Sequence, residues 1–136
     1  MNSFVIANPN KCLGCRTCEI ACVDAHTEKN IFIGDKDIEN FNPRLTVIKI
    51  AGISAPVQCR QCEDAACLKA CPNGSITMED GLVKINRTTC IGCKTCVVAC
   101  PFGAMTMAEE VVNKKVKIVA NKCDLCFGRE AGAACV

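Results

Sequence analysis

The chain has no tryptophan and no tyrosine, and its 136 residues include only five phenylalanines and one histidine. With so few aromatic rings, it offers no platform on which the bases of a single-stranded nucleic acid would stack. The net charge is only +2, and the 16 basic and 14 acidic side chains are interspersed, so no block of one sign follows a phosphate backbone. We therefore expect no nucleic-acid partner.

Long apolar segments are missing as well. The longest uncharged stretch, residues 95–108, is shorter than the ~20 apolar residues of a membrane helix and is interrupted by Pro101 and Gly103. The first nine residues contain neither a basic region nor a long apolar region, so they do not form an export signal. We therefore expect a cytoplasmic chain that does not itself span a membrane, in a compartment where thiols stay reduced.

Cysteine is the residue that the sequence has in excess. Fifteen residues, about 11% of the chain, exceed the ~8–10% that marks a cysteine scaffold. Hydrophobic residues make up 50% of the chain only when cysteine is counted among them. The other apolar residues form a small core, so a chain of this size needs a further source of stability. Because the cysteines are numerous, odd in number and expected in a reducing compartment, they indicate metal ligation rather than disulfide bonds.

The cysteines fall into four groups, which we number motifs one to four. The groups are Cys12, Cys15, Cys18 and Cys22; Cys59, Cys62, Cys67 and Cys71; Cys90, Cys93, Cys96 and Cys100; and Cys123, Cys126 and Cys135. Motifs one and three form an internal repeat, because CLGCRTCEIAC and CIGCKTCVVAC agree at seven of eleven positions. In motif four, a further cysteine would be due three residues after Cys135, whereas the sequence ends at Val136.

Motif three has the spacing C-x2-C-x2-C-x3-C-P, a bacterial ferredoxin signature for 4Fe-4S clusters in which the fourth cysteine ligates the other cluster of a pair. Three thiolates from one curled loop suit three irons of a cubane, and the fourth, one helical turn later, projects to a neighbouring cluster. Motif one has Val23 in place of the proline, and motif two widens one gap by two residues. We expect Gly14 and Gly92 to let the backbone approach the inorganic sulfides.

Structural zinc is the main alternative, because it also binds four thiolates and favours C-x2-C pairs; motif four, taken alone, fits either metal. His26 lies four residues after Cys22, close enough to tune a cluster, to relay a proton or to replace the missing cysteine, although a single histidine is more often a surface or packing residue. Arg16, Arg60 and Lys94 either offset the negative charge of clusters or are simply solvated.

The segments between the motifs predict an α+β fold of short elements. Strand and turn patterns predict hairpins at 75–85, around Asp80–Gly81, and at 104–119, with further strands at 4–6 and 45–48. Short helices are predicted at 17–25, 65–71 and 95–100, and a loop or insertion at 30–43. Met105 and Met107 lie on one strand face and are expected in the core rather than as ligands.

Five segments resemble a known family: MNSFVIANPNKCLGCRTCEIAC, CRQCEDAAC, CPNGSI, CIGCKTCVVACPFGAM and ANKCDLC. They are similar to the four-cluster ferredoxin-like electron-transfer subunits of molybdenum or tungsten oxidoreductases, in particular the HycB/HydN branch found in formate hydrogenlyase, hydrogen-dependent CO2 reductase and formate dehydrogenase systems of anaerobic metabolism. The resemblance spans nearly the whole chain, and it departs at the C-terminus, where relatives continue through a Cys-Pro pair and a closing strand.

The resemblance implies two pseudo-symmetric ferredoxin-like halves. Residues 1–58 and 101–136 would hold motifs one and four, with an insertion at about 27–58, and residues 59–100 with the following hairpin would hold motifs two and three. Four 4Fe-4S clusters are implied, with crossed ligands. They are Cys59, Cys62, Cys67 and Cys100; Cys90, Cys93, Cys96 and Cys71; Cys123, Cys126, Cys135 and Cys22; and Cys12, Cys15 and Cys18 with one ligand missing.

The function that the resemblance implies is a non-catalytic relay of electrons between a formate dehydrogenase or CO2 reductase subunit and a hydrogenase, a second ferredoxin-like subunit or another acceptor. The residues agree, since no nucleophile–base pair, phosphate loop or dinucleotide fingerprint is present in the sequence. Two alternatives stay open: a freely diffusing polyferredoxin or maturation accessory protein, and a zinc-binding interaction module.

Overall fold

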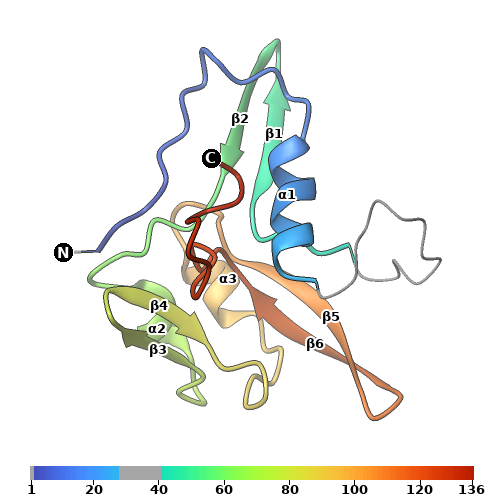
Figure 1. Cartoon of the computed structure of the whole chain (residues 1–136). Helices are drawn as coiled ribbons and strands as arrows, with labels where there is room; N and C mark the ends of the chain where they lie inside the picture. The colour runs from blue at the N-terminus through green and yellow to red at the C-terminus, as the bar shows by residue number, and fades with distance from the viewer. Residues whose placement is uncertain (1, 28–40) are drawn as a thin grey trace.

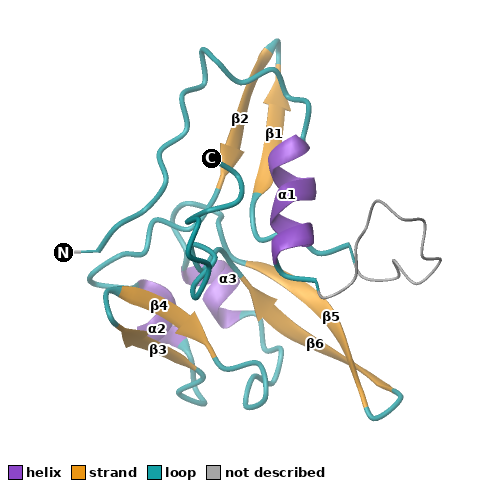
Figure 2. Ribbon diagram, viewed as in Figure 1, coloured by secondary structure: helices purple, strands orange, loops and turns teal. Residues whose placement is uncertain are grey.

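A computed structural model describes residues 2–27 and 41–136 of the chain (Figure 1). Three short helices are present in these ranges: α1 (Thr17–Ala25), α2 (Ala66–Ala70) and α3 (Thr95–Ala99). The strands are β1 (Thr46–Ile50), β2 (Ile53–Val57), β3 (Ile76–Glu79), β4 (Leu82–Ile85), β5 (Thr106–Val112) and β6 (Lys115–Asn121). This is a small α+β fold, as the sequence predicts (Figure 2). No helix in the described ranges has the length and apolarity to cross a bilayer.

Each sheet is a single antiparallel hairpin of consecutive strands, β1–β2, β3–β4 or β5–β6. In every hairpin the two central turn residues have positive φ, which is the geometry of a two-residue type I′ turn and matches the right-handed twist of the strands. These pairs are Ala51–Gly52, Asp80–Gly81 and Asn113–Lys114. The two hairpins predicted from the sequence are confirmed, with strands of β5–β6 that extend further toward the turn than expected.

Two sequence predictions about strands need correction. Residues 4–6 form no strand, because they have no strand partner among the described residues; the carbonyl of Val5 instead accepts a hydrogen bond from the Gln58 side chain (2.9 Å). Strand β2 was missed, since Pro56 argues against a strand interior. The proline is tolerated because β2 pairs on one side only, with β1. Most of the loop predicted at 30–43 lies outside the described residues.

The predicted helices are confirmed within a residue or two, and the repeat between motifs one and three is also a repeat of backbone conformation. Arg16 and Lys94, which precede α1 and α3, have φ of 61° and 64°, and the glycines two positions earlier both have φ of 69°. Helix α3 ends at Ala99, just ahead of the Cys100–Pro101 pair, because the residue before a proline avoids the helical region.

The apolar side chains form two small cores. The larger lies between α2, α3 and the hairpins β3–β4 and β5–β6 in the lower half of Figure 1, and comprises Ala65, Ile76, Val83, Cys96, Met105 and Ala120. The smaller lies beside α1 and β1 and comprises Cys22, Leu45 and Val47. Met105 is 4% exposed, so its predicted place in the core is confirmed. Cysteines pack against both cores, so the sulfur sites and the apolar interior are continuous.

A buried carboxylate joins helix α1 to strand β1. The Glu19 carboxylate accepts a hydrogen bond from the Val47 backbone N–H at 2.7 Å, and Arg16 lies 3.9 Å away on the solvent side. Glu19 is 6% exposed, and a buried carboxylate needs such a partner. The contact fixes the helix that carries Cys18 and Cys22.

The two repeat glycines also lie against the hairpins. A Cβ on Gly92 would lie 2.5 Å from the carbonyl oxygen of Ile118 in β6, and one on Gly14 would lie 3.3 Å from Ser54 in β2. These glycines thus allow each cysteine loop to pack closely against a hairpin, in addition to supplying a positive φ.

We predict that Gly92→Ala destabilises the protein by more than about 2 kcal/mol, because it adds a backbone collision to the left-handed strain of about 1–2 kcal/mol. Gly103→Ala is the matched control, since Gly103 has φ of 64° and open space around it, so only the strain applies. Thermal unfolding followed by circular dichroism measures both, with about 4 °C for each kcal/mol. Equal shifts in the two variants would contradict the close packing on Ile118.

Candidate metal centres

Four cysteines from motifs two and three line one cavity in the larger core, which we call site A. They are Cys59, Cys62, Cys67 and Cys100. The cavity encloses about 390 Å³ of atom-free space, part of it open to solvent. Its remaining wall is mainly apolar, including Val83, Phe102 and Met105, with Lys122 and Arg60 as the two cations. The spacing of motif three predicts that Cys100 serves a neighbouring cluster, and this cavity brings it to three cysteines of motif two.

A second cavity, site B, has the reciprocal composition. Its cysteines are Cys71, Cys90, Cys93 and Cys96, so motif three contributes three sulfurs and motif two one. The space is about 350 Å³, close to that of site A. Gly92 and Met107 also line it, and the Ala120 backbone N–H points at the Cys90 sulfur at 3.4 Å. The two cavities thus exchange one cysteine each between motifs.

Site C gathers the motif four cysteines around the end of motif one. Its members are Cys22, Cys123, Cys126 and Cys135. Cys135 packs against the small core that contains Cys22, and the charge of Cys22 acts on the pKa of both Cys123 and Cys135. The fold thus brings Cys22 of motif one next to the cysteines of motif four.

Site D contains the three remaining cysteines, Cys12, Cys15 and Cys18. They share one loop that enters α1, and the Cys12 carbonyl accepts a hydrogen bond from the buried Ser54 hydroxyl at 2.9 Å. Burial, with a smaller contribution from Cys12, raises the pKa of Cys18. Cys15 is exposed to solvent.

The surroundings of the sulfur atoms suit thiolates bound to a metal. Backbone N–H groups point at five of the sulfurs at 3.3–3.5 Å, which places partial positive charge where a cluster is negative. The pairs are Gln61 to Cys59, Ala120 to Cys90, Arg44 to Cys22, Leu125 to Cys123 and Ala134 to Cys126. None of the fifteen cysteines forms a disulfide. The residues present therefore fit iron-sulfur clusters.

Thiol pKa values divide the cysteines by burial. Hydrogen bonds from Thr17 and Thr95 lower the pKa of the exposed Cys15 and Cys93. Burial raises the pKa of Cys96, and that of Cys123 to about 11. A buried thiol of this kind becomes a thiolate when a metal ion replaces its proton.

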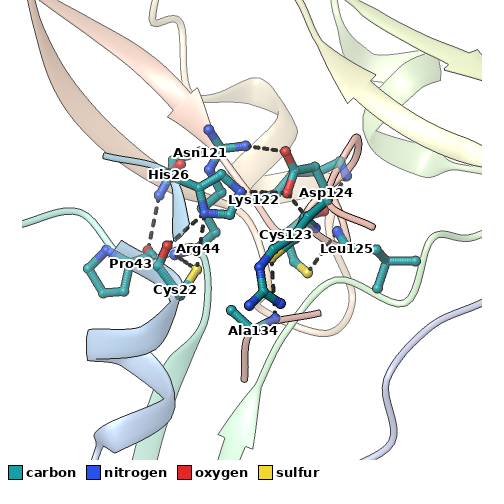
Figure 3. Close-up of polar contacts among 12 residues, drawn as sticks. Cys22, His26, Pro43, Arg44, Asn121, Lys122, Cys123, Asp124, Leu125 and Ala134 are labelled. Carbon is teal, nitrogen blue, oxygen red and sulfur yellow. Dashed lines mark hydrogen bonds and ion pairs between the residues drawn. The ribbon is translucent and has the colours of Figure 1, made fainter. Parts of the chain in front are cut away.

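A half-buried charge network lies beside site C (Figure 3). The Asp124 carboxylate accepts hydrogen bonds from His26 Nε2 (2.9 Å), from Arg44 (2.7 Å) and from the Cys126 backbone N–H (3.0 Å). Burial would raise the pKa of Asp124, but the bond from His26 and the charge of Arg44 lower it to about 2. The network ties motif four to the end of α1.

His26 is therefore engaged on both sides of its ring. Its Nδ1–H donates to the carbonyl oxygen of Cys22 at 2.7 Å while Nε2–H donates to Asp124. These contacts, the bond to Asp124 first, raise the pKa of His26 to about 10. With both ring nitrogens engaged in hydrogen bonds, His26 has no free nitrogen for iron in this arrangement, although it lies with Asp124 and Cys126 in a group whose ligand atoms are within 4.8 Å of one another. Its contacts connect the end of α1 to motif four.

Three polar residues at the sites escaped the sequence analysis: Gln61, Lys122 and Asp124. Each adjoins a cysteine of a C-x2-C pair, and that proximity was the only signal available. Gln61 is fully buried and Lys122 is 4% exposed, which no hydropathy pattern indicates for amide and ammonium groups. Their role depends on contacts between residues some sixty positions apart.

Comparison with protein families gives two matches. Residues 50–136 match the 4Fe-4S dicluster domain, and residues 9–23 match a 4Fe-4S binding domain. The first match covers motifs two to four and the second covers motif one.

The chain is also similar to several bacterial proteins. It is 50% identical to the electron transport protein HydN of Escherichia coli K12 over the whole chain and 82% of that protein. It is 42% identical to hydrogenase-4 component A of the same strain, over 69% of this chain and 42% of that component. The protein AegA, which carries an oxidoreductase name, is 50% identical over the whole chain, but the chain spans only 20% of AegA.

We predict that His26→Gln lowers the stability of the protein by about 2 kcal/mol near pH 6, because it removes a charged hydrogen bond. The folded-state pKa of His26 is raised from 6.5 to about 10, so its contribution is complete below pH 6.5 and is lost as the pH rises through about 10. The difference in unfolding midpoint should therefore shrink between pH 6 and 10. Thr27→Val is the control, since its hydroxyl-to-Val23 bond does not titrate; a constant His26→Gln deficit would contradict the assignment.

Proposed function

Because the chain belongs to the 4Fe-4S dicluster family and is an electron-transfer protein that carries 4Fe-4S clusters, we propose that it is the relay subunit of a larger oxidoreductase complex. In this proposal it links a catalytic subunit of the formate dehydrogenase or CO2 reductase type to a hydrogenase or a second ferredoxin-like subunit. The names of HydN and of hydrogenase-4 component A support an electron-transfer role beside a hydrogenase. The zinc-binding alternative is set aside by the same family match.

The proposed ligand sets are the cysteines of sites A to D, with one cluster at each site. The observation that carries this proposal is the composition of the two cavities, each lined by four cysteines of which one comes from the other motif. A bound 4Fe-4S cluster supplies one-electron redox chemistry, while the protein sets its position and potential through burial and amide donors. We propose that the two cores correspond to the two ferredoxin-like halves.

Three connections arrange the sites in a row. Cys67 and Cys71, at either end of α2, belong to sites A and B, so one helical turn of about 5.4 Å separates neighbouring ligands. Cys18 and Cys22 on α1 join sites D and C in the same way. Sites A and C meet where the Gln61 side chain donates to the Cys123 carbonyl at 2.7 Å. The proposed order is D, C, A, B.

The two end sites contain the most exposed cysteines. Cys15 of site D and Cys93 of site B are the two cysteines classed as exposed. Apolar side chains next to the cysteine loops are exposed as well, with Leu13 at 85% near site D and Ile91 at 62% near site B. Exposed apolar groups beside a terminal redox site suit a protein interface at each end. This arrangement favours a relay between two partners over a freely diffusing carrier.

We predict that Cys100→Ser perturbs the cluster of Cys59, Cys62 and Cys67 and leaves that of Cys90, Cys93 and Cys96 intact, because Cys100 lines site A. Cys71→Ser is the reciprocal control and should perturb only site B. Iron analysis and EPR or Mössbauer spectroscopy of anaerobic protein measure both effects. Loss of the cluster within the mutated motif in either variant would overturn the crossed ligand sets.

We predict that the affinity-tagged chain, isolated anaerobically from its host, copurifies in stoichiometric amounts with a formate dehydrogenase-type subunit and with a hydrogenase or ferredoxin-like subunit. Leu13→Glu and Ile91→Glu should each release one of the two partners at unchanged iron content, since they charge opposite ends of the row. Val111→Glu, on the exposed β5 strand, is the matched control and should release neither. A chain that is isolated alone with full iron content would favour the free carrier or maturation protein instead.

A further inference from the structure

Lys122 is a lysine buried between two of the proposed cluster sites. It is 4% exposed, directly precedes Cys123 of site C, and lines the cavity of site A. None of the ion pairs found among the described residues includes it. A buried ammonium without a carboxylate partner is unusual, because removing a charge from water costs several kcal/mol.

Two neutral oxygens hold the Lys122 ammonium in place. It donates to the carbonyl oxygen of Cys123 at 2.8 Å and to the Gln61 side-chain oxygen at 3.3 Å. Gln61 is fully buried, and its amide is held by the Val83 backbone N–H at 3.0 Å and by its own donation to Cys123 at 2.7 Å. These contacts fix the position of the charge, but they leave it unneutralised.

Lys122 lines two cavities. In one of them the nearby carboxylate, Asp124, is already bound by His26 and Arg44, whereas in the other, site A, the ligands of a bound cluster would supply the negative charge. We propose that Lys122 is a positioning residue for electron transfer, whose buried positive charge raises the reduction potential of the cluster held by Cys59, Cys62, Cys67 and Cys100. This inference rests on the proposed ligand set of site A. Reduction adds one negative charge to a cluster, so a fixed cation in a medium of low dielectric constant favours the reduced state.

The contacts select site A rather than site C. On the side of site C, the ammonium faces the carbonyl oxygen of Cys123 rather than its sulfur. On the side of site A, burial and the charge of Cys59 raise the pKa of Cys67, and the charge of Lys122 opposes that rise. Lys122 also lines the same cavity as Cys67, whereas Cys123 is not part of that lining.

Arg60 is the other cation at site A, and its setting is different. It is exposed, and its guanidinium lies over the ring of Phe102 at 4.7 Å and near that of Phe4 at 5.9 Å. Water and salt screen an exposed charge, whereas a buried one is screened much less. Lys122 therefore provides the main unscreened positive charge at this cavity.

The test is an anaerobic redox titration of the holoprotein followed by EPR, with the site A signal identified by its loss in Cys100→Ser. Lys122→Met should decrease the ratio of reduced to oxidised cluster at site A at least tenfold at a given potential, which corresponds to a midpoint about 59 mV lower. The shift should persist at high salt, because the charge is buried. Lys122→Arg should retain most of the potential, and Lys115→Met, which removes an exposed charge at the far end of β6, should leave it unchanged.

Lys122→Gln, which keeps a hydrogen-bond donor, serves as a second charge-removing variant and should shift the potential in the same direction. An unchanged site A potential in Lys122→Met with full iron content would overturn the proposal while leaving the ligand sets intact. A shift of the potential confined to another cluster would also overturn the proposal. Loss of the site A cluster in both variants would overturn it too, because Lys122 would then be needed for cluster assembly. If Cys100→Ser fails to remove a cluster of motif two, the ligand set is wrong, and that result is recognised independently of Lys122.

Discussion

The structure depends on the burial of sulfur. Nine of the residues packed against or within the two apolar cores are cysteines, at positions that leucine or valine would fill in an ordinary small domain. Burial raises the pKa of thiols such as Cys96 and Cys123 and favours the protonated form, so these groups become thiolates only when a metal ion replaces the proton. Because the apolar cores are small, cluster binding and folding are expected to be strongly linked.

The short helices connect neighbouring sulfur sites, so that the proposed sites follow one another in a row. Each helix is one or two turns long and carries the last cysteine of its motif one turn beyond the loop that holds the others. Helix α2 thereby connects sites A and B, and α1 connects sites D and C. Polar side chains make the remaining connection, with Gln61 bound to the Cys123 carbonyl and Asp124 bound to His26 and Arg44.

Positive charge is distributed along this row in two forms. Arg16, Arg60 and Lys94 lie next to cysteines in the sequence and are exposed in the fold, although Arg60 lines site A and Lys94 lines site B. Lys122 is buried and held by neutral oxygens, so its field acts on the adjacent cavity. The two forms differ because solvent screening weakens an exposed charge far more than a buried one. Distance to a cysteine in the sequence is therefore a poor guide to electrostatic influence.

The sequence by itself determined the cysteine spacing, the short helices that follow each cysteine loop and the turn of β3–β4, because all of these depend on contacts within about ten residues. It did not reveal β2, where Pro56 opposes strand formation locally, and it wrongly predicted a strand at residues 4–6, since a strand exists only with a partner. The family resemblance already implied that Cys100 joins the cysteines of motif two. Only the tertiary structure decided that His26 donates to Asp124 and that Lys122 is buried against Gln61. Those outcomes depend on packing between residues far apart in the chain, and no local pattern encodes which of several similar loops meet.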